Sequence, residues 1–132
     1  MDKAIEEIVD LTLDLIRFQS VSRDLTSLDQ CACFLERYLK TSKIDYVRHN
    51  SNGVPSLLVT PGTNSFPVLL VSHIDVVDGS DRLFTPRVED GKIYGRGSVD
   101  DKYAVALSLV LLKRVLARGK ISGRGQKDLN FG

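Results

Sequence analysis

The sequence predicts an α/β fold, in which a mixed sheet carries helices on its faces. Apolar residues recur at helical spacing near the start of the chain and again over residues 103–118. Between these two stretches lies Val68–Val71, a continuous run of β-branched and leucine residues. The 132 residues suit one domain, and 42% hydrophobic with 27% charged residues is the composition of a globular protein.

The first two helices are predicted from the spacing of their apolar residues. Residues 2–18 form the first, and the second begins at a capping box made of Ser27 and Gln30. Five residues form the buried stripe of the second helix: Leu28, Cys31, Ala32, Leu35 and Leu39. Cys31 and Cys33 point to different helix faces, so we expect neither a disulfide nor a shared metal between them.

The pattern then changes to that of strands. Residues 44–49 are β-like, and Asn52-Gly53 predicts a turn before a short apolar run over residues 56–60. Residues 61–64, Pro-Gly-Thr-Asn, predict a further turn.

Val68–Val71 predicts a strand that is covered on both faces. A loop follows over residues 78–86, and Asp90-Gly91 predicts a hairpin. The last helix, over residues 103–118, ends at Gly119. Its apolar residues occupy most of its circumference, so we expect it to lie deep against the sheet.

Charge is distributed unevenly along the chain. The net charge is +1, but residues 113–132 carry +5 and the preceding residues −4. The basic end has one aromatic residue, Phe131, and lacks the pattern of a single-strand binder, so we expect no nucleic-acid partner. The longest nearly apolar run, residues 104–112, is too short for a membrane span. The acidic start does not resemble a signal peptide, and we therefore expect a cytoplasmic protein with no membrane partner.

His73 and Asp75 are the first candidate site residues. They lie two positions apart after the predicted strand, so in an extended chain both side chains project from one face. The carboxyl ends of strands are where open α/β sheets bind ligands. An aspartate beside a metal-bound imidazole accepts its second N–H and fixes its tautomer. Taken alone, the pattern favours an ordinary surface histidine near an acid.

Residues 95–102, Gly-Arg-Gly-Ser-Val-Asp-Asp-Lys, form the second candidate region. Asp100 stands where a dinucleotide fingerprint needs its third glycine, and no Gly-Lys-Ser/Thr follows, so neither nucleotide loop is present. Asp101 is equally well explained as a cap at the start of a helix. Asp100 and His73 together are ligand types that zinc accepts.

These segments together resemble the zinc exopeptidase and amidohydrolase family. That family includes aminoacylases, acetylornithine deacetylase, succinyl-diaminopimelate desuccinylase, glutamate carboxypeptidases and carnosinase-type dipeptidases. The similar segments are residues 72–77 (Ser-His-Ile-Asp-Val-Val), 84–86 (Phe-Thr-Pro) and 90–102, together with 18–22 (Phe-Gln-Ser-Val-Ser) at the end of the first helix. The resemblance implies a truncated zinc-exopeptidase-like catalytic domain. Residues 1–118 would be its N-terminal part, and residues 119–132 a basic tail that does not match.

The resemblance also implies roles for single residues. His73 would bind one zinc ion, Asp75 would orient His73, and Asp100 would bridge two zinc ions. The peptide bond between Asp100 and Asp101 would be cis. Arg96 and Lys102 match the motif without being ligands, and we expect them to support the loop by ion pairing.

The sequence departs from the family pattern in two ways. Tyr103 stands where the family usually has glycine. More seriously, the family's general base and a second ligand form a Glu-Glu pair downstream, followed by an acidic ligand, a distant histidine and a lid domain that forms the dimer. No glutamate follows Glu89 in this sequence, and its other histidine, His49, precedes the motifs.

We therefore expect an N-terminal fragment of a zinc-dependent hydrolase, inactive or weakly active alone. Its substrate would be a dipeptide or an N-acyl amino acid, cleaved at the amide bond. The alternative is a non-enzymatic folded remnant that binds a partner or self-associates through an exposed sheet edge. A metallophosphoesterase would need more histidine or asparagine ligands than the chain holds.

Overall fold

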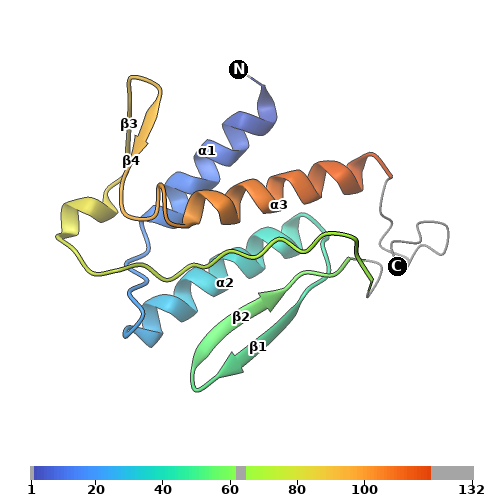
Figure 1. Cartoon of the computed structure of the whole chain (residues 1–132), viewed down its shortest axis with the longest axis horizontal. Helices are drawn as coiled ribbons and strands as arrows, with labels where there is room; N and C mark the ends of the chain where they lie inside the picture. Colours follow the sequence, from blue (N-terminus) through green and yellow to red (C-terminus); the bar gives the residue numbers. More distant parts are fainter. Residues whose placement is uncertain (1, 62–64, 120–132) are drawn as a thin grey trace.

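The computed structural model describes residues 2–61 and 65–119. These residues form three α-helices, four strands and one short 3₁₀ helix, in the order α1-α2-β1-β2-η1-β3-β4-α3 (Figure 1). The helices are α1 (Lys3–Ile16), α2 (Leu25–Thr41) and α3 (Lys102–Ala117). The strands are β1 (Val47–Ser51), β2 (Val54–Leu58), β3 (Arg87–Glu89) and β4 (Lys92–Tyr94), and the 3₁₀ helix η1 is Asp81–Phe84. The α/β class is confirmed.

Helices α1 and α2 lie where the apolar spacing predicts them. Asp2 caps α1, because its Oδ1 accepts the Ala4 N–H at 2.7 Å. The capping box predicted at Ser27 is wrong, since α2 begins one turn earlier and Asp24 is its N-cap. The Asp24 side chain accepts the Ser27 N–H, so Ser27 is the capped residue rather than the cap. All five residues of the predicted stripe are buried.

The strands form two separate antiparallel hairpins, β1–β2 and β3–β4, in place of one continuous sheet. Each hairpin has a two-residue turn, with Ser51 opposite Val54 and Glu89 opposite Lys92. The turn residues Asn52 (φ 51°), Gly53 (φ 82°), Asp90 (φ 50°) and Gly91 (φ 72°) all have left-handed backbones. This turn type needs a positive φ at both positions, which is why Asn-Gly and Asp-Gly predicted the turns. The turn predicted at residues 61–64 lies mostly outside the described residues.

The strand predicted at Val68–Val71 is wrong. These residues have no regular secondary structure, and each residue is between 60% and 81% exposed. Among the described residues, the only β contact in this part of the chain is a parallel bridge between Val21 and Val76. An apolar run becomes a buried strand only when neighbouring strands pair with it and helices cover it. No such neighbours occur in residues 2–61 and 65–119.

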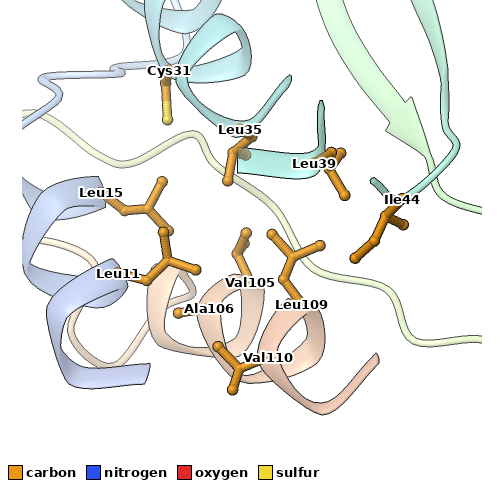
Figure 2. Packing of buried hydrophobic residues seen from close by; sticks show 10 residues of the cluster. All are labelled: Leu11, Leu15, Cys31, Leu35, Leu39, Ile44, Val105, Ala106, Leu109 and Val110. Atoms are coloured by element: carbon orange, nitrogen blue, oxygen red, sulfur yellow. The ribbon is translucent and has the colours of Figure 1, made fainter. Parts of the chain in front are cut away.

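The core lies between the three helices (Figure 2). Its buried members are Leu11, Leu15, Cys31, Leu35, Leu39, Ile44, Val105, Ala106, Leu109 and Val110. Helix α3 packs mainly on α1, and its buried residues share one core cluster with those of α2. The expectation that it lies deep against a sheet is wrong, because the strands form two small hairpins. Its outer face remains partly open, with Tyr103 and Leu111 each more than 40% exposed. Within the described ranges, no helix combines the length and hydropathy that a membrane crossing requires.

Candidate metal centre

His73 and Asp100 meet in space although 27 positions separate them in the chain. His73 lies in the extended segment before the Val76 bridge, and Asp100 lies just ahead of α3. The imidazole Nε2 is 2.9 Å from Asp100 Oδ1. Both side chains are accessible, with 48% of His73 and 84% of Asp100 exposed. The structure therefore brings together the two predicted ligands at the protein surface.

Asp75 lies on the opposite side of the imidazole. Its carboxylate Oδ1 is 3.1 Å from His73 Nδ1, and its backbone carbonyl is 3.0 Å from the same nitrogen. An N–H on Nδ1 would leave Nε2 free to bind a metal. Ser22 donates a 2.8 Å hydrogen bond from its hydroxyl to Asp75 Oδ2. No role for Ser22 follows from the sequence alone, although Ser22 belongs to the segment that resembles the family.

These contacts change the pKa of His73. Partial burial lowers that pKa, but the Asp75 carbonyl and the Asp100 carboxylate, with the charge of Asp75, more than offset the burial. The net direction is upward from the ordinary value of 6.5. The protonated imidazolium is therefore favoured when only these acidic partners surround the ring.

Asp101 contacts His73 rather than capping α3. It occupies the N-cap position, but its side chain makes no capping hydrogen bond. Its Oδ2 accepts the His73 backbone N–H at 3.3 Å instead. The peptide bond between Asp100 and Asp101 is cis, as the resemblance implies. Both aspartates of the pair therefore contact His73, one through its ring and one through its backbone.

A cavity of about 280 Å³ adjoins these residues. Its lining includes His73, Asp75, Asp100 and the loop residues Gly95 and Arg96. A larger groove of about 340 Å³ runs along α1 and α2, but neither histidine lines it. The smaller cavity is therefore the one that combines space for a ligand with an imidazole and carboxylates.

The donor set fits one end of a zinc site. A tetrahedral zinc with bonds of about 2.0–2.1 Å holds neighbouring ligand atoms about 3.3 Å apart, so the 2.9 Å pair of His73 and Asp100 would need to open only slightly. Asp75 faces the other ring nitrogen and cannot join these two at one ion. The described part of the chain holds no group of three or more His, Cys, Asp or Glu residues arranged to bind a metal.

Among the described residues, Arg96 and Lys102 form none of the ion pairs expected of them. Arg96 Nη2 donates to the Asp78 carbonyl at 3.1 Å, and its buried Nε has no hydrogen-bond partner in the described part of the chain. Lys102 is completely buried and donates to two backbone carbonyls at the end of α1. Both side chains thus hold the loop in place by donating to backbone carbonyls. Residue type alone does not predict these carbonyls as the partners.

Comparison with known proteins gives consistent matches. The sequence profile described as Peptidase family M20/M25/M40 matches residues 69–124. The chain is 36% identical over 111 residues to the succinyl-diaminopimelate desuccinylase of Sulfurovum sp. (strain NBC37-1), covering 80% of this chain and 29% of that protein. It is 32% identical over 116 residues to the enzyme of the same name from Stenotrophomonas maltophilia (strain K279a), covering 83% and 30%.

An animal relative is similar over the same stretch. The chain is 31% identical over 121 residues to an N-fatty-acyl-amino acid synthase/hydrolase of Danio rerio, covering 84% of this chain and 24% of that protein. The chain thus spans less than a third of the length of these relatives. Over the part that it shares with them, the chain belongs to Peptidase family M20/M25/M40.

Proposed function

We propose that the chain carries the first part of the catalytic centre of a zinc-dependent hydrolase. The reaction would cleave the amide bond of a dipeptide or an N-acyl amino acid. The convergence of His73 Nε2 and Asp100 Oδ1 at 2.9 Å is the observation that carries this proposal. The names of the relatives support it, since a desuccinylase and an N-fatty-acyl-amino acid hydrolase both act on acylated amino groups.

Each residue of the site has a separate part in this proposal. His73 would hold zinc through Nε2, with Asp75 orienting the ring through Nδ1. The exposed carboxylate of Asp100 would be the ligand shared by two zinc ions. Zinc held there would supply a Lewis acid and lower the pKa of a water molecule.

Activity of this chain alone should be weak or absent. A catalytic zinc takes three protein ligands and keeps one open position, whereas two ligands converge among the described residues. No glutamate follows Glu89 in the sequence to act as the expected general base. Loss of general-base catalysis lowers a rate by roughly a hundredfold or more.

Zinc titration of matched histidine variants tests the site. We expect wild-type protein to bind zinc and His73→Ala to lose that binding. His49→Ala is the control, because His49 is the only other histidine and lies exposed on β1. Equal zinc binding by both variants would contradict the site.

Hydrolysis of N-succinyl amino acids, N-acyl amino acids and dipeptides is measured in parallel, and two tightly bound zinc ions with ordinary turnover would contradict the proposed weak activity.

A cytoplasmic location is part of the same proposal. Cys31 and Cys33 are both free thiols in the structure. Burial raises the pKa of the Cys31 thiol to about 11, which keeps it protonated and unreactive. Free, unpaired cysteines are typical of a reducing compartment.

A second candidate function is self-association as a non-enzymatic module. Val68–Val71 presents four consecutive exposed apolar residues without regular secondary structure, a feature that favours association with another chain. We expect a concentration-dependent dimer in sedimentation, weakened by Leu69→Lys. Val88→Lys is the control, since Val88 is exposed on the separate β3–β4 hairpin. A monomer at all concentrations would exclude this candidate.

A further inference from the structure

Lys102 is the largest completely buried side chain among the described residues, and the proposed function gives it no part in binding metal or substrate. Its Nζ donates hydrogen bonds of 2.7 Å to the carbonyl oxygens of Leu15 and Phe18, at the end of α1. An ammonium is costly to bury unless its donors are satisfied. Burial lowers its pKa to about 8, an effect that the nearby Cys31 opposes. A buried lysine that binds a helix end joins two parts of the chain that are 84 or more positions apart.

The stem of Lys102 also packs against the loop that leads to Asp100. Gly97 in this loop has φ +101°, and a Cβ added there would lie 2.7 Å from Cδ of Lys102 and 3.0 Å from its Cγ. Glycine is required at this position by the backbone and by the closeness of the lysine stem. Lys102 is therefore in contact with the loop as well as with α1.

The same end of α1 leads directly to residues that hold the other half of the candidate site. Ser20 donates from its hydroxyl to the Ile74 carbonyl at 2.6 Å, and its backbone carbonyl accepts the Val76 N–H at 2.9 Å. These two bonds fix the backbone on both sides of Asp75. Figure 1 shows α1 and α3 side by side. Lys102 is the first residue of α3. The end of α1 and the residues just after it are thus bonded both to Lys102, which follows the Asp100–Asp101 turn, and to the segment that contains His73 and Asp75.

We propose that Lys102 is a positioning residue, which holds the Asp100–Asp101 turn at the distance from the His73–Asp75 segment that metal binding requires. This inference rests on the proposed function, in which His73 and Asp100 are ligands. It goes beyond that function because the lysine acts through the end of α1 and touches neither metal nor substrate.

The test compares Lys102→Met with Val110→Ala. Methionine keeps the apolar stem and removes the ammonium, while Val110 is a fully buried core residue further along α3. We expect Lys102→Met to weaken zinc binding at least tenfold under conditions in which it remains folded. Val110→Ala should change zinc affinity less than twofold. Equal zinc affinity in the two folded variants would overturn the proposal.

A metal-free measurement separates failure of this inference from failure of the proposed function. The His73 amide, bonded to Asp101, gives an NMR signal that should shift in Lys102→Met and stay in place in Val110→Ala. If wild-type protein binds no zinc, the proposed function fails, and an unshifted His73 signal then overturns the positioning role as well.

A second pair of variants covers the case in which Lys102→Met does not fold. Gly97→Ala should displace the lysine stem and shift the same signal, whereas Gly91→Ala has a similarly left-handed backbone (φ +72°) with nothing within 4 Å of the added Cβ. Equal His73 signals in these two variants would overturn the proposal.

Discussion

The contact of Asp75 with His73 should strengthen metal binding, although Asp75 is not itself a ligand. Asp75→Asn keeps the size of the side chain and removes the charge that faces His73 Nδ1 at 3.1 Å. We expect zinc affinity to fall about 10- to 100-fold, because a neutral amide makes the imidazole a weaker donor and fixes its tautomer less firmly. Competition with a chelating dye measures this loss.

Asp90→Asn is the matched control for that change. Asp90 lies in the β3–β4 turn with φ 50°, a conformation that asparagine adopts readily. Its zinc affinity should equal that of wild type within twofold. Equal affinities for Asp75→Asn and wild type would show that Asp75 does not support the imidazole.

The contacts of some single residues could be predicted from the sequence, whereas those of others could not. The spacing of His73 and Asp75 predicted a shared face, and the family resemblance linked them to Asp100. The structure brings all three together. The direct bond from the Asp101 carboxylate to the His73 N–H was not predictable, because it depends on where two distant segments meet. Residue type likewise suggested an ion pair for Lys102, whereas burial leaves it bonded to carbonyls.

At the scale of elements, Glu7 joins all three helices. Its Oε1 on α1 accepts the Tyr38 hydroxyl of α2 at 2.8 Å and the Lys113 ammonium of α3 at 2.6 Å. The Lys113 hydrogen bond lowers the pKa of Glu7 below its ordinary 4.5. Burial raises this pKa, whereas the Tyr38 hydrogen bond lowers it further. The ionised carboxylate therefore stabilises the packing of the helices.

We expect Glu7→Gln to lower the free energy of unfolding at neutral pH by about 1 kcal/mol, since the pair is partly exposed. A pKa lowered by folding contributes stability above the unfolded value, and this contribution is lost as pH falls through the folded value. The free energies of unfolding of Glu7→Gln and wild type should therefore become equal as pH falls below 4.5. Urea unfolding across this range measures it. Glu6→Gln, at an exposed neighbouring position, is the control and should lower the free energy of unfolding at neutral pH by less than Glu7→Gln does.

Helices and hairpins were predictable because their signals are local. Apolar spacing and caps define α1 and α2, and the pairs Asn52-Gly53 and Asp90-Gly91 define the turns. The start of α2 was misplaced because Asp24 and Ser27 both suit a cap, and the backbone decides between them. A buried strand such as the one predicted at Val68–Val71 depends on partners elsewhere, so its local sequence is insufficient.

Among the described residues, the buried core ends at Val110, before the last turns of α3. All ten residues of the core cluster lie between Leu11 and Val110. The last turns of α3 still contribute, because Lys113 bonds to Glu7 and Arg114 lies 3.6 Å from Asp2. Gly119, with φ +68°, follows the helix and donates its N–H to the Leu116 carbonyl. The boundary proposed between residues 118 and 119 therefore lies where helix α3 has been completed.

A chain of residues 1–119 should fold as stably as the full chain. We expect its free energy of unfolding to change by no more than about 0.5 kcal/mol, the range of changes that leave the core and its contacts intact. A chain of residues 1–112 should be clearly less stable, because it loses the contacts of Lys113 and Arg114 with α1. Urea unfolding of the three chains distinguishes these outcomes. A large loss of stability in residues 1–119 would show that the basic end belongs to the folded unit, since only its removal separates that chain from the full one.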